Sequence, residues 1–196
     1  MRGGVVTKTF AICLALMVNT LSAQEFKLGS HVSDFQVRDL DGKTVNFSAL
    51  KGPITVVTFI ATECPVSNSY NRRMSDLYKD YTAKNVKFIF VNANRTEPAG
   101  DVREHAQRVG FPFVVYKDPD NVLADRFDAQ VTPENFVIDS SGVIRYHGAI
   151  DDNMNESRVH SRALRAALDA LLAGKPLPSA ETKAFGCTIK RVRKAS

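Results

Sequence analysis

One short segment restricts the possible folds more than any other part of the chain: an apolar run that leads directly into a cysteine and a helix. Residues 54–61 are β-branched or apolar almost throughout, which is the pattern of a central strand covered on both faces. After Cys64-Pro65, apolar residues recur at spacings of three and four over residues 67–81, as in an amphipathic helix. A buried strand followed by a helix indicates an α/β fold.

The remaining pattern continues this alternation of strands and helices. Residues 35–47 alternate between apolar and polar around Asp41-Gly42, which predicts an N-terminal β-hairpin with a tight turn. Further strands are expected at 86–91, 113–116, 135–139 and 143–146, and further helices at 101–109, 121–127 and 155–173. We therefore predict a mixed central sheet flanked by helices, formed by one domain over residues 24–174 and followed by an extended tail over residues 175–196.

The first 23 residues have the composition of a secretory signal peptide. Arg2 and Lys8 precede an apolar stretch of about nine residues, and small residues end at Ala23, where we expect cleavage. The stretch is well short of the roughly 20 residues that span a bilayer, so an uncleaved anchor is the weaker alternative. The prediction is a periplasmic or secreted protein. Cys13 leaves with the peptide, and the mature chain keeps two cysteines in a compartment that permits disulfides.

Composition and charge exclude several classes of protein. Hydrophobic residues make up 44% and charged residues 24% of the 196 residues, which is ordinary for a soluble domain and unlike a disordered, collagen-like or polytopic membrane protein. The net charge of +5 comes largely from Arg2 and Lys8 and from the basic residues 190–194. No nucleic-acid partner is indicated, and membrane contact is expected only through the signal peptide. The cysteines lack the spacing of a zinc site, so we expect neither metal nor cofactor.

Cys64 is the candidate for chemistry because of its position. It follows the C-terminal end of a buried strand and directly precedes a helix that has Pro65 in its first turn, where a proline fits best. Unpaired amides at a helix start favour a thiolate, and the pKa of cysteines so placed is typically about 3.5 to 7.5. The sequence therefore predicts a nucleophile. A buried structural cysteine is the alternative.

Two motifs taken together resemble a known superfamily. Cys64-Pro65-Val66-Ser67 after a buried strand, and Val131-Thr132-Pro133 before another strand, are similar to motifs of the thioredoxin-like redoxins. This superfamily includes the AhpC/TSA proteins and exported thiol-disulfide oxidoreductases, and the resemblance covers roughly residues 26–173. It implies a thioredoxin-like fold in which Pro133 is cis and Thr132 lies beside Cys64. We also expect a substrate groove shaped by Pro65, Thr132 and Pro133, with Ser67 hydrogen-bonded to the thiolate.

The chain also departs from these relatives. Ser67 stands where the dithiol members have a second cysteine, so the usual local disulfide cannot form. Ala61 and Val57 stand where peroxiredoxins have a threonine or serine and a proline, and Thr132-Pro133 occupies the region of their arginine. These departures count against peroxidase activity.

The tail contains a second cysteine in an apolar patch. Residues 184–190 read Ala-Phe-Gly-Cys-Thr-Ile-Lys, and we expect this patch to dock on the domain. It resembles the Gly-Cys-x-Ile-Lys ending of some exported bacterial redoxins that have Cys-Pro-x-Ser sites. At up to about 3.5 Å per residue, the tail after Gly174 is long enough to reach Cys64. We hypothesise that Cys187 is the resolving partner of Cys64. A permanent structural disulfide and two independent thiols are the alternatives.

These observations lead to one predicted function and two alternatives. The prediction is an exported thiol-disulfide oxidoreductase in which Cys64 attacks a disulfide and Cys187, or an external thiol, resolves the mixed disulfide. Its partners would be a protein thiol or disulfide, or an external thiol reductant. The alternatives are a divergent thiol peroxidase, and a copper-binding or redox-inert protein of the same fold, because thiolate and imidazole suit copper. The four histidines share no short spacing.

Overall fold

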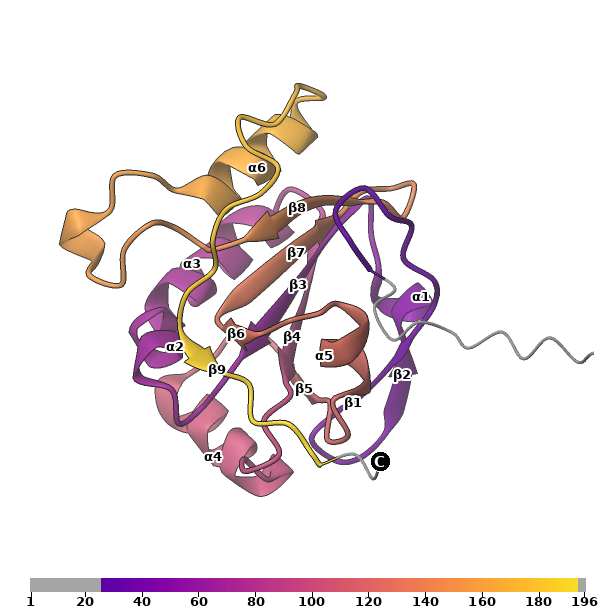
Figure 1. Ribbon diagram of the computed structural model, residues 1–196, viewed down its shortest axis with the longest axis vertical. Helices are drawn as coiled ribbons and strands as arrows, with labels where there is room; N and C mark the ends of the chain where they lie inside the picture. Colours follow the sequence, from indigo (N-terminus) through magenta and orange to yellow (C-terminus); the bar gives the residue numbers. More distant parts are fainter. Residues whose placement is uncertain (1–25, 194–196) are drawn as a thin grey trace, which may run out of the picture.

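The computed structural model describes residues 26–193, so the predicted signal peptide lies outside the described residues. Within that range the strands form a seven-stranded sheet in the order β2-β1-β5-β4-β3-β7-β8 and a two-stranded sheet of β6 and β9 (Figure 1). The strands are β1 (Gln36–Arg38), β2 (Thr44–Asn46), β3 (Ile54–Ile60), β4 (Val86–Asn92), β5 (Val115–Lys117), β6 (Val131–Thr132), β7 (Glu134–Ile138), β8 (Ile144–Gly148) and β9 (Cys187–Thr188).

Helices cover both faces of the large sheet. They are α1 (Phe47–Leu50), α2 (Pro65–Ser69), α3 (Asn71–Thr82), α4 (Ala99–Val109), α5 (Val122–Arg126) and α6 (Ala163–Leu172), together with one 3₁₀ turn, η1 (Glu156–Arg158). Strands β3, β4 and β5 are parallel, whereas β7, β8 and the β1–β2 hairpin are antiparallel to their neighbours. The predicted mixed sheet and N-terminal hairpin are confirmed.

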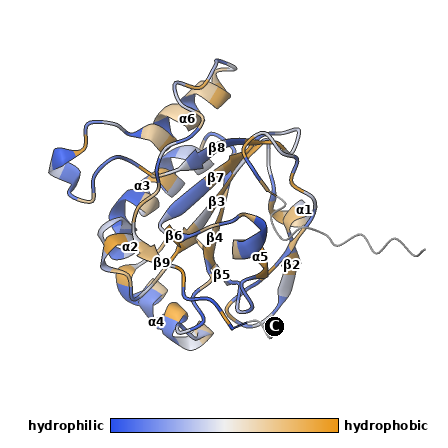
Figure 2. Ribbon diagram, in the orientation of Figure 1, coloured by the Kyte–Doolittle hydropathy of each residue, from blue (hydrophilic) through white to orange (hydrophobic). Residues whose placement is uncertain are grey.

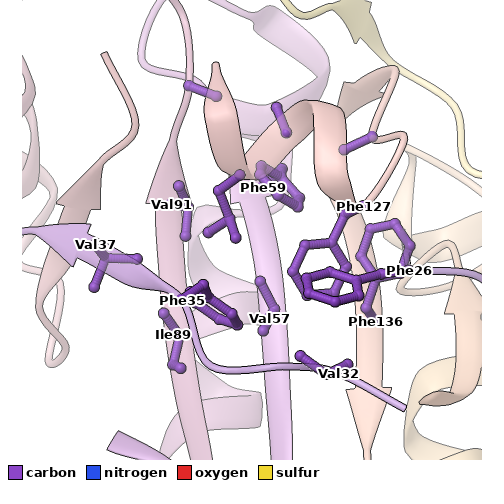
Figure 3. Packing of buried hydrophobic residues seen from close by; sticks show 14 of the residues in the cluster. Phe26, Val32, Phe35, Val37, Val57, Phe59, Ile89, Val91, Phe127 and Phe136 are labelled. Atoms are coloured by element: carbon purple, nitrogen blue, oxygen red, sulfur yellow. The ribbon is translucent and has the colours of Figure 1, made fainter. Parts of the chain in front are cut away.

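Strand β3 lies between two hydrophobic layers because its side chains alternate between the two faces. Val57 and Phe59 pack with residues of α1 and α5, and Figure 3 shows the aromatic residues of that layer meeting over the sheet. Val56 and Ile60 pack on the other face with α3, α4 and α6. All seven residues of β3 are buried, as the apolar run predicts. Burial of each large side chain contributes about 1.5–3 kcal/mol.

Two predicted helices differ from the observed ones. The helix expected over residues 67–81 is divided at Tyr70 into α2 and α3. The prediction of a helix over residues 155–173 is wrong for the first half of this range, where η1 and an irregular segment precede α6. The Asp152 carboxylate accepts the N–H groups of His160 and Ser161 at 3.0 and 3.1 Å, and these bonds hold the backbone out of helical geometry. Figure 2 shows α6 as largely hydrophobic and η1 as hydrophilic.

The segment after α6 runs to β9, which lies beside β6 and α2, and then continues toward α5 (Figure 1). This docked position confirms the expectation for the tail. Within residues 26–193, every helix falls short of the length or apolarity that crossing a bilayer requires.

Candidate redox site

Cys64 and Cys187 form a disulfide. Cys64 follows β3 and is the N-cap residue of α2, whereas Cys187 begins β9 in the tail. Their Cα atoms are 5.8 Å apart, although 123 positions separate them in the sequence. The hypothesis that the tail delivers the partner of Cys64 agrees with this pairing, and the reading with two unpaired thiols does not. The bond joins the segment at the C-terminal edge of the central strand to β9 in the C-terminal tail.

The tail is aligned at this site by backbone pairing. Strands β6 and β9 are antiparallel, with Thr132 opposite Cys187 and Val131 opposite Thr188. The N–H of Ile189 continues the ladder by donating to the carbonyl of Gln130 at 2.9 Å. The position before the cysteine is a glycine at a close backbone approach, because a Cβ on Gly186 would overlap the carbonyl oxygen of Thr132. The sequence Gly-Cys therefore fits this strand pairing.

The loop around Pro133 lies against Cys64 as the resemblance implies. The Thr132–Pro133 peptide bond is cis. The Sγ of Cys64 lies 3.5 Å from the carbonyl oxygen of Thr132. Pro65 occupies the first helical position of α2 and is exposed. The structure therefore brings Pro65, Thr132 and Pro133 to the same edge as the disulfide.

Ser67 contacts the sulfur through its backbone rather than its hydroxyl. Its N–H donates to the Sγ of Cys64 at 3.3 Å, whereas its Oγ accepts the N–H of Ala61 at 3.1 Å. A hydrogen bond from an amide stabilises a sulfur anion more than a neutral thiol. The hydroxyl instead ties the start of α2 to the end of β3, which holds Cys64 in place between them.

A buried carboxylate, which the sequence analysis did not single out, supports the loop before Cys64. Glu97 is 2% exposed and accepts the backbone N–H groups of Thr62 and Glu63 at 2.8 and 3.2 Å. It also accepts the side-chain amides of Asn92 and Asn94. Burial raises the pKa of Glu97, but these hydrogen bonds outweigh it and the pKa is lowered. Glu97 therefore remains charged and orders the backbone of the two residues that precede Cys64.

The same polar cluster reaches the tail. The Oδ1 of Asn94 accepts the N–H of Lys190 at 2.7 Å, and the carbonyl of Lys190 accepts the N–H of Arg95 at 2.9 Å. The buried ammonium of Lys117 donates to the carbonyl of Glu97 at 2.7 Å, and burial lowers the pKa of this lysine. Both sides of the disulfide are thus attached to one network of buried polar groups.

A second buried carboxylate, Glu134, orders the loop that contains the cis proline. It is 3% exposed and accepts the N–H groups of Gln130 and Val131 at 2.7 and 3.1 Å. Its other oxygen lies 2.7 Å from the Nε2 of His147. Burial lowers the pKa of His147, but Glu134 and then Glu181 outweigh it and the pKa is raised. The acid at the start of residues 134–138, directly after Thr132-Pro133, was the sequence signal for this arrangement.

Among residues 26–193, potential metal ligands do not cluster at the disulfide. Within the part of the chain that the structure describes, no three His, Cys, Asp or Glu side chains are grouped so that they could hold a metal ion. His147, on β8, has two carboxylates as its partners.

Comparison with known proteins finds a matching family model and relatives similar in sequence and in structure. A model described as the AhpC/TSA family matches residues 28–147. The thiol-disulfide oxidoreductase ResA of Bacillus subtilis (strain 168) is 27% identical over 132 residues, which are 67% of this chain and 72% of that protein. The crystal structure of an uncharacterized conserved protein from Geobacillus kaustophilus is 30% identical, with a TM-score of 0.80, and the match covers 87% of this chain and 95% of that one.

A more distant structure establishes the type of fold. The thioredoxin domain of a thiol-disulfide oxidoreductase from Bacteroides vulgatus has a TM-score of 0.53 at 19% identity, over 61% of this chain and 86% of that one. The fold is therefore thioredoxin-like, as the two motifs implied.

Proposed function

The chain belongs to the AhpC/TSA family, and we propose that it is an exported thiol-disulfide oxidoreductase whose redox-active pair is Cys64 and Cys187. One observation carries the proposal: the disulfide lies at the C-terminal edge of β3, between the start of α2 and the cis-Pro133 loop. This edge is where open α/β sheets place their chemistry. The relatives named as thiol-disulfide oxidoreductases support the same assignment.

The reaction transfers two electrons between sulfur atoms. In the reduced protein, the Cys64 thiolate attacks one sulfur of a substrate disulfide, and the other substrate sulfur leaves as a thiolate. The Cys187 thiolate then attacks the Sγ of Cys64, and the first substrate sulfur leaves in turn. The substrate gains two electrons and becomes a dithiol, while Cys64 and Cys187 become a disulfide. The reverse sequence oxidises a dithiol.

The neighbouring residues have supporting roles in this proposal. The Ser67 N–H stabilises the Cys64 thiolate because it donates directly to the sulfur. Thr132 and Pro133 shape the groove in which the substrate disulfide lies, and Pro65 sets the start of α2. Cys187 replaces the missing local cysteine, because β9 places it opposite Thr132.

Export follows from the N-terminal pattern of the sequence. Residues 1–23 combine early basic residues, a short apolar stretch and terminal small residues, as a signal peptide does. An oxidising compartment would also maintain the Cys64–Cys187 disulfide between reaction cycles.

The first test is the redox behaviour of the two thiols in the mature protein. Alkylation followed by intact-mass measurement should show two modified cysteines only after mild reduction, which would indicate a bridge that opens readily. In the Cys187→Ser variant, mixed disulfides with substrate proteins or with an oxidised thiol should accumulate on Cys64, with Cys64→Ser as the control. No adduct on Cys64, or a bridge that opens only under strong reductant, would contradict the proposal. Rapid oxidation of the Cys64 thiol by stoichiometric peroxide would indicate a thiol peroxidase instead.

A further inference from the structure

We propose that the reductant of the oxidised protein attacks Cys187, and that Cys64 is the sulfur that leaves. This inference rests on the proposed function and specifies its reductive half. A thiol can in principle attack either sulfur of a disulfide, and the outcome depends on access and on the quality of the leaving thiolate. Both conditions differ between the two sulfurs of this protein.

Access favours Cys187. Cys64 is 3% exposed, and its Sγ is enclosed by the Ser67 N–H and by the carbonyl oxygen of Thr132. Cys187 is partly exposed and precedes the exposed Thr188 on an edge strand. An external thiol therefore meets the sulfur of Cys187 first.

The leaving group favours the same direction. The Sγ of Cys64 accepts the Ser67 N–H at 3.3 Å, so the negative charge that develops on this sulfur is stabilised as the bond breaks. Among the hydrogen bonds found for residues 26–193, none reaches the Sγ of Cys187. A thiolate with the lower pKa leaves faster, and Cys64 is the sulfur that has a donor.

The tail is held on the domain by contacts upstream of Cys187. The Oγ1 of Thr182 lies 2.7 Å from the hydroxyl of Tyr146 and accepts the Ala149 N–H at 3.0 Å. The N–H of Thr182 donates to the carbonyl of His147 at 3.0 Å. These contacts do not depend on the disulfide.

Downstream contacts hold the other side of the tail. The side chain of Ile189 is 3% exposed within the apolar layer over β3. The guanidinium of Arg191 donates to the Asp125 carboxylate at 2.9 Å and to the carbonyl of Ala129. Because both sides are anchored, β9 covers Cys64 in the oxidised protein. The first thiol of the reductant is therefore directed to Cys187.

The electrons balance over two steps. The thiolate of the reductant attacks the Sγ of Cys187, the disulfide breaks, and Cys64 leaves with the bonding pair as a thiolate. A second thiolate of the reductant attacks the reductant sulfur of the adduct, and Cys187 leaves as a thiolate that takes up a proton. The reductant becomes a disulfide and has supplied two electrons. It is therefore a dithiol, or two monothiols, that fits at a partly exposed edge strand.

The position of the first adduct tests the inference. The oxidised mature protein is mixed with 2-mercaptoethanol and quenched in acid at short times. Free thiols are then blocked with N-ethylmaleimide, and peptide mass spectrometry locates the adduct. We expect at least a tenfold excess of 2-mercaptoethanol on Cys187, with the maleimide on Cys64. An equal distribution, or a majority on Cys64, would overturn the inference.

Variants of the tail test the reason for the preference. Ile189→Ala loosens the downstream anchor and should raise the share of adduct on Cys64 several-fold. Arg191→Ala removes a second anchor and should act in the same direction if Ile189→Ala does not fold. Lys183→Ala, an exposed tail residue, should keep the wild-type ratio. A wild-type ratio in both anchor variants would refute coverage by the tail as the cause.

This test is independent of the rate at which the disulfide opens. A disulfide too stable for exchange would contradict the proposed function, yet a high concentration of 2-mercaptoethanol would still show which sulfur is attacked. Rapid reduction with the adduct on Cys64 would leave the proposed function intact and overturn only the role of Cys187.

Discussion

Replacement of Glu97 by glutamine should destabilise the protein through the loop at the end of β3. The Oε1 of Glu97 accepts N–H groups of Glu63 and Asn94, and its Oε2 accepts those of Thr62 and Asn92. A glutamine of the same shape keeps one accepting oxygen and places an NH₂ group against the other pair of donors. In either orientation, a backbone N–H of Thr62 or Glu63 loses its acceptor.

The expected loss is about 4 kcal/mol. Two donors lose their acceptor, and each unsatisfied buried donor costs about 1–3 kcal/mol. The asparagines cannot compensate by exchanging the positions of their side-chain oxygen and nitrogen, because each oxygen already has a donor. The Oδ1 of Asn92 accepts from the Lys117 ammonium, and the Oδ1 of Asn94 accepts the backbone N–H of Lys190. With a urea dependence of about 2 kcal/mol/M, the midpoint of unfolding should fall by about 2 M.

Urea unfolding followed by circular dichroism, with the disulfide intact, measures this change. The matched control is Glu104→Gln, which alters an exposed carboxylate on α4 and should leave the midpoint unchanged. If Glu97→Gln unfolds at the same urea concentration as this control, the Glu97 hydrogen bonds do not order the loop and the reasoning is refuted.

The pH dependence provides a second check on Glu97. Its pKa lies below the ordinary value of 4.5 because the hydrogen bonds to the charged form outweigh burial. A lowered pKa in the folded state means that the stabilisation is present above the unfolded pKa and is lost as the pH falls through the folded pKa. The difference in stability between wild type and Glu97→Gln should therefore narrow below about pH 4.5.

Two further perturbations act on the tail and its surroundings. The pKa of His147 is raised above its ordinary value of 6.5 because Glu134 outweighs burial. The protonated ring therefore stabilises the folded state when the pH is below the unfolded pKa. This stabilisation is lost as the pH rises through the folded pKa. The stability difference between wild type and His147→Gln should therefore shrink as the pH rises above the ordinary value of 6.5, and a constant difference would contradict this. Gly186→Ala should slow formation of the disulfide on reoxidation, measured by timed alkylation, because its Cβ would overlap the carbonyl of Thr132. Gly100→Ala, whose Cβ would meet nothing within 4 Å, is the control, and equal rates for the two variants would exclude the steric explanation.

Residues close in sequence explain what could be predicted. The period-two and apolar patterns identified β3 and the N-terminal hairpin because alternation along a strand reflects which side chains are buried. The position of Cys64 followed from the end of one strand and the start of one helix. The cis peptide before Pro133 followed from the resemblance, which depends on two short motifs in a fixed order. The strand, hairpin and Cys64 inferences use information contained within about a dozen residues, whereas the resemblance combines two motifs that lie far apart in the sequence.

Hydrogen bonds that form only in the folded backbone explain what could not be predicted. Residues 155–173 have helical spacing, yet hydrogen bonds from Asp152 hold the first part of this segment out of a helix. Glu97 lies in a polar loop, where nothing in the sequence distinguishes it from an exposed acid until Thr62 and Glu63 are brought to it. The contact of Ser67 with the sulfur was expected, but only the folded backbone shows that the amide makes it.

The sequence by itself determined that a cysteine stands between a buried strand and a helix, that its motifs resemble a thioredoxin-like domain, and that a second cysteine follows in an apolar tail patch. Only the tertiary structure decided that these two sulfurs bond, that β9 covers Cys64, and that Cys187 is the more exposed of the pair. The physical reason is that local periodicity reports burial, whereas the pairing of β6 with β9 depends on backbone hydrogen bonds between residues more than 50 positions apart. No local pattern specifies such a partner, because every extended segment offers the same backbone donors and acceptors.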